Sequence, residues 1–165
     1  MIREHFYFLT DDYCNRYAEY GVMRNKEIVD EVSHNRPCFY AIQDDIEKDI
    51  FWMIPISSQI EKYEKILDEK LKRYPVYDGL EFGYVRGRYA AFLIQNMCPA
   101  REDDIIEEYI DKNNNQPVVI SSNALKSAIS KKTKKLVNLT KKGMKVTQTE
   151  AYEIYKDLKL KKYEK

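Results

Sequence analysis

The chain has 165 residues, of which 44% are hydrophobic and 33% are charged, with a formal net charge of +1 at pH 7. This length favours a single domain over residues 1–165, since domains run to roughly 100–200 residues, and the composition argues against a disordered chain. No window holds the roughly 18 apolar residues of a transmembrane helix. The first 13 residues carry four charges, which is not the pattern of a secretory signal. We therefore expect a cytoplasmic protein with no membrane partner.

Three cysteines, Cys14, Cys38 and Cys98, are an odd number and have no paired spacing. This usage predicts free thiols in a reducing compartment. The sequence contains no C-x-x-C or H-x-x-x-H spacing, so we expect neither a metal site nor a cofactor.

The small net charge conceals an asymmetry along the chain. Residues 121–165 contain thirteen lysines and four acidic residues, a net charge of +9, whereas the first 120 residues contain fifteen basic and twenty-three acidic residues, a net charge of −8. A basic third on an acidic body predicts an anionic partner, with nucleic acid as the first candidate. The competing interpretation is a solvated, lysine-rich helix, and charge alone favours neither.

The first elements in chain order are a strand at residues 5–9 and a short helix at residues 13–20. Thr10 supplies the N-cap chemistry of that helix and Gly21 ends it. Residues 22–35 are polar, and we expect them to be rich in loops.

Two strands follow at residues 38–43 and 50–56, joined by a hairpin connection. The second strand is apolar on both faces, so it is predicted to be central and buried. A helix is expected over residues 59–74, with an apolar face at helical spacing and Pro75 as its stop.

Residues 82–86 and 89–96 predict a second hairpin around Gly87-Arg88. Pro99 is expected to break its second strand, and residues 102–110 are expected to form a short acidic helix.

The basic third begins with Ser121-Ser122 as the cap of a helix over residues 123–139, which Gly143 ends. The run Thr147-Gln148-Thr149-Glu150 has the pattern of a capping box and predicts a last helix. Short strands with interspersed helices indicate an α+β fold with a mostly antiparallel sheet.

Two serines, Ser57 and Ser58, stand where the buried strand meets the following helix. Ser58-Gln59-Ile60-Glu61 is itself a capping box, so the serines have a purely structural interpretation. A helix N-terminus is also a seat for phosphate, and Lys62 would add a positive charge one turn into the helix. The two interpretations do not exclude each other.

The stretch "FWMIPISS" at residues 51–58, followed by a lysine-bearing helix, resembles the ToxN/AbiQ family of endoribonuclease toxins from type III toxin–antitoxin systems, and its CptN branch most closely. Three further stretches, "RPCFYAI" (36–42), "FLIQNMCPA" (92–100) and "ALKSAISKKTKKL" (124–136), are similar to a first core strand, a later strand and a basic helix of that family. The resemblance runs from about residue 6 to residue 139. The order and spacing of the four stretches carry it, since no single one is specific.

The resemblance implies a strongly bent, mostly antiparallel sheet, an SH3-like barrel decorated with helices and akin to the MazF and Kid toxins. It implies metal-independent, sequence-selective cleavage of cellular RNA, and with it growth inhibition in bacteria. The implied partner is a small RNA antitoxin, made as tandem repeats that the toxin cuts and then binds in a closed protein–RNA ring. It leaves the size of the ring and a role in phage defence open.

The family's hydroxyl pair falls on Ser57 and Ser58. A catalytic lysine follows two residues later in the ToxN branch, where this chain has Ile60, and the nearest lysine here is Lys62. The family's basic residue before the first core strand corresponds to Arg36 or, less closely, to His34.

The implied chemistry is attack of a ribose 2′-OH on the adjacent phosphorus, which leaves a 2′,3′-cyclic phosphate and a 5′-OH. We assign stabilisation of the pentavalent oxyanion to Lys62 and Arg36, and phosphate binding or proton relay to Ser57 or Ser58. His34 is the group in this neighbourhood that ordinarily titrates near neutral pH, so it is either the general base or an ordinary loop histidine.

RNA contacts are expected at an aromatic residue and a basic patch. Tyr63 is the expected stacking residue. The phosphate-contacting patch is expected on the basic helix, at Lys126, Lys131, Lys132, Lys134 and Lys135. Two alternatives remain, a non-catalytic RNA-binding module and a protein–protein domain in which the serines are only a cap.

Overall fold

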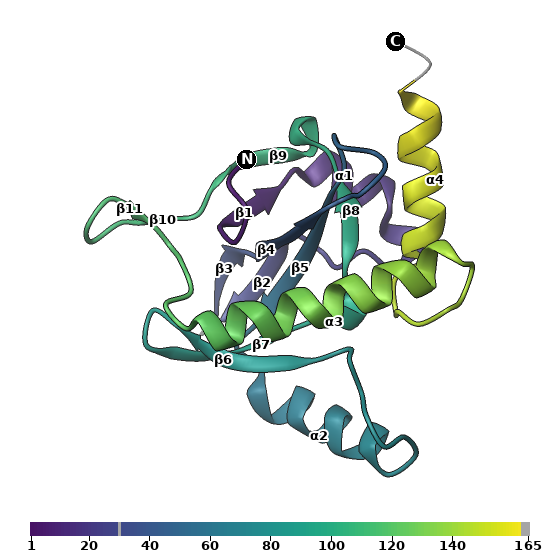
Figure 1. The fold of residues 1–165 in the computed structure, drawn as a ribbon. Helices are drawn as coiled ribbons and strands as arrows, with labels where there is room; N and C mark the ends of the chain where they lie inside the picture. The colour runs from purple at the N-terminus through teal and green to yellow at the C-terminus, as the bar shows by residue number, and fades with distance from the viewer. Residues whose placement is uncertain (30, 163–165) are drawn as a thin grey trace.

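The computed structural model describes residues 1–29 and 31–162, and their largest element is an antiparallel sheet (Figure 1). Its strand order is β6-β7-β5-β4-β1-β9, and β8 pairs with β5 beside this path. The strands are β1 Phe6–Leu9, β4 Pro37–Gln43, β5 Phe51–Ser57, β6 Glu81–Val85, β7 Arg88–Phe92, β8 Cys98–Ala100 and β9 Ile105–Glu108. Four α-helices accompany the sheet: α1 Asp11–Arg16, α2 Ile60–Leu71, α3 Asn123–Lys141 and α4 Ala151–Lys161. The predicted α+β class is confirmed.

The sheet is open, because β6 and β9 at the ends of the described strand order do not pair with each other. The structure therefore does not confirm the predicted barrel. The sheet does change partners along β5, which pairs with β8 through Phe51–Met53 and with β7 through Ile56 and Ser57. Pro55 lies between the two pairings, and its carbonyl accepts a hydrogen bond of 2.9 Å from the Leu93 amide.

Strand β5 occupies the central, buried position predicted for it. Trp52, Met53 and Ile54 are fully buried. The rings of Phe6, Phe39 and Phe92 pack together from β1, β4 and β7, with centroids 5.2 to 6.4 Å apart. The hydrophobic run of β5 thus lies in the middle of the core. The C-terminal end of β5 is held by pairing with β4 on one side and with β7 on the other.

Helices α2 and α3 lie on opposite sides of the β6–β7 hairpin, as Figure 1 shows. Helix α3 approaches β6 closely because Gly83 has no side chain, and a Cβ there would lie 2.2 Å from a methyl carbon of Leu125. Helix α2 packs on the other side, where Tyr63 joins a small buried cluster with Leu80, Ala91 and Leu93. The turn of the hairpin is Arg86-Gly87, both with positive φ, one residue earlier than expected.

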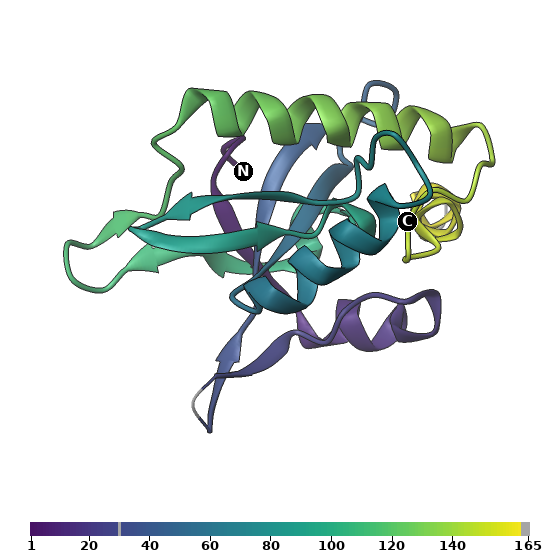
Figure 2. The ribbon, with the colours of Figure 1, turned by 90° about the horizontal axis from the view of Figure 1, so that it is seen from below.

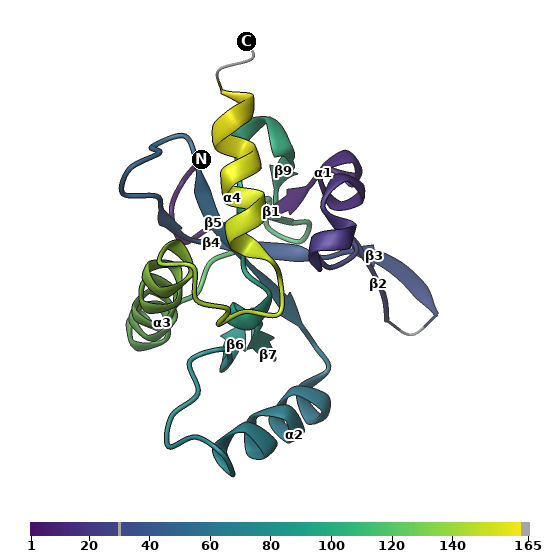
Figure 3. The ribbon, with the colours of Figure 1, turned by 90° about the vertical axis from the view of Figure 1, so that its right-hand side faces the viewer.

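A second hairpin, β2 Lys26–Val29 with β3 Val32–Asn35, projects from the body beside α1 (Figures 2 and 3). Residues 22–35 were predicted to be rich in loops, so this prediction is wrong. The sequence signal is weak because the segment lacks the alternation of apolar and polar residues that marks a half-buried strand. Figure 3 shows the hairpin and α3 on opposite sides of the molecule.

Residues 102–110 were predicted to be helical, and this is also wrong. A 3-10 helix covers only Glu102–Asp104, after which the chain forms β9. Strand β9 pairs with β1, with Tyr7 opposite Glu108. Adding a strand to the open edge of β1 satisfies its backbone groups, and this tertiary gain outweighs the helix preference of the acidic residues. The predicted strand at residues 89–96 is also too long: β7 ends at Phe92, a 3-10 helix follows at Ile94–Asn96, and Pro99 lies inside the separate strand β8 instead of ending a strand.

The helix caps agree with the sequence only in part. Thr10 and Ser122 cap α1 and α3, accepting hydrogen bonds from the amides of Tyr13 and Leu125. The predicted capping box before α4 is wrong, because its N-cap, Glu150, makes no side-chain cap hydrogen bond. The Thr147 hydroxyl instead donates to the Thr149 carbonyl at 2.6 Å. The short β10 Ile110–Asp111 and β11 Gln116–Pro117 complete the strands.

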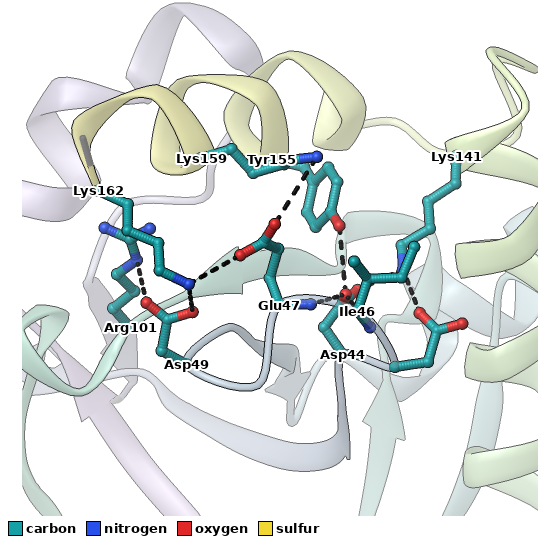
Figure 4. Close-up of polar contacts among 10 residues, drawn as sticks. Asp44, Ile46, Glu47, Asp49, Arg101, Lys141, Tyr155, Lys159 and Lys162 are labelled. Atoms are coloured by element: carbon teal, nitrogen blue, oxygen red, sulfur yellow. Dashed lines mark hydrogen bonds and ion pairs between the residues drawn. The ribbon is translucent and has the colours of Figure 1, made fainter.

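The basic third is docked on the acidic body through ion pairs (Figure 4). Asp44, which is 1% exposed, accepts hydrogen bonds from the Trp52 indole at 3.0 Å and the Tyr155 hydroxyl at 3.2 Å, and lies 2.6 Å from the Lys141 ammonium. Glu47 lies 3.1 Å from Lys162 in the same way. Eight of the twelve lysines that the structure describes from residue 121 onward form ion pairs, and six of these eight pair with acidic residues of the first 120. Much of the charge asymmetry is therefore neutralised within the chain.

In the part of the chain that the structure describes, no helix has the length and apolar character needed to cross a bilayer.

Candidate active site

Ser57 is the last residue of β5 and is 3% exposed. It lies opposite Ala91 of β7, and its hydroxyl oxygen accepts a hydrogen bond of 3.2 Å from the Gln59 amide. This short side-chain contact turns the chain from the strand toward α2, as serine hydroxyls do in tight turns. Ser58, the next residue, is exposed. We call residues 56–62 the β5–α2 junction.

Helix α2 begins at Ile60, and its N-cap is Gln59, which makes no side-chain cap hydrogen bond. The Ser58 carbonyl, rather than its hydroxyl, accepts from the Ile60 amide at 2.9 Å. The predicted capping box of Ser58 and Glu61 is therefore wrong. Since no described side chain caps α2, the positive end of its dipole is directed at the space beside Ser58.

Arg36 reaches this junction from the segment between β3 and β4. Its guanidinium donates a hydrogen bond of 3.1 Å to the Ile56 carbonyl, one residue before Ser57. Its backbone amide donates to the carbonyl of Asn25 at 2.5 Å. The structure thus brings the Arg36 guanidinium to the residue before Ser57, although Arg36 and Ser57 are 21 residues apart in sequence.

Asn25 is a positioning residue that sequence reasoning missed. It is 6% exposed, and its side-chain amide donates to the Leu9 carbonyl at 2.8 Å and to the Asp11 carboxylate at 3.0 Å. It therefore fixes the backbone that holds Arg36 to the end of β1. A single asparagine in an apparent loop gives no sequence signal for this role.

Lys62 is exposed in the first turn of α2, and its ammonium lies 5.2 Å from the centre of the Tyr63 ring. Side chains of a helix tilt toward its N-terminus, so the lysine can reach a group held beside Ser58. Tyr63 itself is 5% exposed. Its burial contradicts the predicted stacking role, because the ring has no face open to a base.

His34 lies on the projecting hairpin, exposed and opposite Glu27 in the β2–β3 register. It precedes Arg36 by two residues. No contact between His34 and either serine occurs among the described residues, so a role as general base stays a prediction.

The predicted basic patch on α3 is smaller than expected. Lys132 and Lys135 lie 2.9 and 2.5 Å from Glu81 and Asp78, and Lys126 lies 3.5 Å from Glu4. Lys131 and Lys134 are exposed and have no ion pair within the described ranges. Both lysines belong to α3, which lies on the other side of the β6–β7 hairpin from α2 (Figure 1).

The three cysteines are free and buried, as predicted. Burial raises the pKa of the Cys14 thiol to about 11 and that of Cys98 to about 12, so neither is a thiolate nucleophile at neutral pH. Among residues 1–29 and 31–162, no group of three His, Cys, Asp or Glu side chains is arranged to hold a metal ion. A hollow of about 200 Å³ is lined by residues between Thr140 and Glu153, none of which is a predicted site residue.

The chemistry available at the β5–α2 junction is recognition of an anion. The N-terminus of α2 has no side-chain cap, Ser58 and Lys62 are exposed within its first turn and the residues before it, and the Arg36 guanidinium bonds to the Ile56 carbonyl nearby. Such donors bind a phosphodiester and gain strength as negative charge grows on it.

No protein-family model matches the chain, and no curated protein sequence matches it. Among solved structures, it is similar to AbiQ, a lactococcal anti-phage endoribonuclease belonging to the type III toxin–antitoxin system. The superposition has a TM-score of 0.65 at 14% sequence identity and covers 96% of this chain and 98% of the AbiQ chain. At this identity the likeness establishes the fold, which is AbiQ-like over nearly the whole chain.

Proposed function

We propose that this protein is an endoribonuclease toxin of a type III toxin–antitoxin system, with residues 1–165 acting as one domain in the cytoplasm. The observation that carries the proposal is the AbiQ-like fold, which covers almost all of both chains. The cluster of Arg36, Ser57, Ser58 and Lys62 at the β5–α2 junction supports it, because these groups suit a phosphodiester. We place the chain nearest the CptN branch on the four sequence stretches described above.

The reaction is a transesterification within the RNA backbone. The 2′-oxygen forms a bond to the adjacent phosphorus and loses its proton, while the bond from phosphorus to the 5′-oxygen breaks and that oxygen gains a proton. The products are a 2′,3′-cyclic phosphate and a 5′-OH. The positive groups of the junction stabilise the extra negative charge of the pentavalent transition state, and no metal ion takes part.

The protein groups divide this work by their positions. Lys62 and the first turn of α2 face the phosphate from the helix side, and Arg36 faces it from the strand side. Ser58 is the exposed hydroxyl and contacts the phosphate directly, whereas Ser57 shapes the turn that presents it. His34 is the candidate general base, brought to the scissile bond when RNA lies against the β2–β3 hairpin.

The partner that follows from this function is a small RNA made from tandem repeats. The toxin cuts the repeat transcript, and the resulting units bind neighbouring toxin molecules in a closed ring that covers their active sites. Cellular RNAs are the substrates when the antitoxin is scarce.

A second candidate is a non-catalytic RNA-binding module. The observation that favours it is the burial of Ser57, whose hydroxyl is already engaged with the Gln59 amide. In that case the junction would bind phosphate without cutting the chain.

Expression in a bacterial host tests the proposal. Inducing the chain should stop growth and fragment cellular RNA, and co-expression of a tandem-repeat RNA encoded just upstream of the gene should restore growth. A binding module would leave RNA intact. Unimpaired growth together with intact RNA would contradict the toxin function.

A further inference from the structure

Two exposed tyrosines lie side by side on the β6–β7 hairpin. Tyr84 and Tyr89 are directly opposite each other in the register, with ring centroids 5.1 Å apart, and they are 65% and 40% exposed. The Tyr89 ring also stacks on Phe82, with centroids 6.1 Å apart and planes at 19°. Because Phe82 packs against the buried cluster under α2, the row of rings is anchored at one end and open at the other.

This aromatic row lies on the same face of the sheet as Ser57. Residues opposite each other in an antiparallel pair share a face, and Ser57 is opposite Ala91, which is opposite Phe82. Tyr89 is two residues from Ala91 along β7, a distance of about 7 Å. The row therefore begins close to Ser57 and continues past the end of β5. Figure 2 shows the hairpin extending beyond the first turn of α2.

A row of exposed tyrosine rings is suited to binding unpaired nucleic-acid bases. Unpaired bases stack on aromatic side chains, and single-stranded RNA is recognised largely in this way. Continuity with the phosphate-binding junction favours a nucleotide over an apolar protein surface as the occupant.

We propose that Tyr84 and Tyr89 form a stacking platform for the unpaired base next to the scissile phosphate. This inference rests on the proposed function, since it takes the phosphate to be held at the β5–α2 junction. The platform transfers the predicted stacking role from the buried Tyr63 to rings that are open to solvent. Stacking tolerates every base, so the platform positions the RNA and favours the bases that stack most strongly.

The test measures binding of a short single-stranded RNA made uncleavable by 2′-O-methyl groups. Wild type, Tyr84→Ala and Tyr89→Ala are compared, each with the intact RNA and with RNAs in which one base at a time is removed. Each alanine variant should weaken binding of the intact RNA roughly tenfold. At one position of the RNA, base removal should weaken binding to wild type and leave binding to the alanine variants almost unchanged.

Three further variants separate stacking from other effects. Tyr84→Phe and Tyr89→Phe keep the rings and should bind as wild type does. Tyr74→Ala removes another exposed tyrosine, 54% exposed and outside the row, and should also leave affinity unchanged. Denaturant unfolding of each variant shows whether a loss of affinity comes from a loss of fold.

The outcomes distinguish this inference from the function on which it rests. The platform would be overturned, and the endoribonuclease left intact, if the alanine variants bind like wild type while unmodified RNA is still cut. A wild type that shows the expected base-removal pattern but never cuts natural RNA would support the platform and contradict the enzyme. Equal base-removal losses in wild type and alanine variants would overturn the platform.

Discussion

At the scale of single residues, the two serines of the β5–α2 junction have different environments. Ser57 is buried and accepts from the Gln59 amide, whereas Ser58 is exposed and its hydroxyl does not cap α2. Sequence reasoning located the pair correctly but assigned the structural role to Ser58. The error arises because the sequence Ser58-Gln59-Ile60-Glu61 has the pattern of a capping box. In the structure the local hydrogen bond is made one residue earlier, where the Ser57 hydroxyl accepts from the Gln59 amide in a turn.

Alanine substitutions separate these roles. Ser57→Ala removes a buried acceptor and should lower the free energy of unfolding by about 1 kcal/mol. Ser58→Ala should change stability by less than about 0.5 kcal/mol, while reducing cleavage more than roughly tenfold by removal of a phosphate donor. Denaturant titration and an RNA cleavage assay measure both. Full cleavage by Ser58→Ala would remove that serine from the active site.

Lys62 is the second residue whose role can be isolated. Its side chain is exposed, so Lys62→Ala should leave stability nearly unchanged. Loss of a charge aimed at the transition state should lower the rate of cleavage by roughly 10²-fold. Lys65→Ala, an exposed lysine one turn further along α2, is the matched control and should cut normally. A fully active Lys62→Ala variant would move the role to Arg36.

At the scale of elements, strongly patterned segments were predicted and weakly patterned ones were not. The apolar run of β5 and the periodic faces of α2 and α3 specify burial directly, so these elements were found. The β2–β3 hairpin and β9 have no such pattern, since one projects from the body and the other forms by pairing with β1. A family resemblance predicted that Arg36 and the serines share a site. The pairing of Tyr84 with Tyr89 could not be predicted, because it depends on the register of β6 and β7, which the sequence alone does not determine.

Helix α3 allows a test of RNA binding outside the junction. Lys131 and Lys134 are the exposed lysines of the predicted patch that form no ion pair among described residues. If both contact RNA phosphates, replacing them with alanine should lower the slope of log affinity against log salt by about one to two units. Lys142→Ala with Lys145→Ala removes two exposed lysines just after the C-terminal end of α3 and serves as the control. An equal slope in both double variants would identify the α3 lysines as a solvated face.

In the molecule as a whole, ion pairs between acidic residues of the first 120 and lysines of residues 121–162 attach the basic third to the acidic body. Burial raises the pKa of Asp44, but hydrogen bonds from Lys141, from Trp52 and from the amides of Glu47 and Ile46 outweigh this and leave the pKa below its usual value. The carboxylate therefore joins the β4–β5 connection to the end of α3 and to α4 (Figure 4).

This arrangement predicts loss of stability in acid. A carboxyl whose pKa is lower in the folded state stabilises the fold above its unfolded pKa of about 3.8, and this contribution is lost as pH falls through the lower, folded value. Asp44→Asn should lower the free energy of unfolding at pH 7 by roughly 2–4 kcal/mol. On acidification the free energy of unfolding of this variant should fall by less than that of wild type. Denaturant unfolding from pH 7 to pH 2 measures this. Asp68→Asn, an exposed aspartate of α2, is the control, and an Asp44→Asn variant that matches it would show that Asp44 does not hold α4 in place.

We expect this chain to cut RNA by attack of the neighbouring 2′-OH, without a metal ion. The direct measurement is incubation of the purified protein with a defined RNA in excess EDTA, alongside the same RNA carrying a single 2′-deoxy substitution at the cut position. The protein should cut the first RNA to a 2′,3′-cyclic phosphate and a 5′-OH, and should not cut the second RNA at the substituted position. Failure to cut in EDTA, or equal cleavage of both RNAs to other end groups, would contradict this expectation.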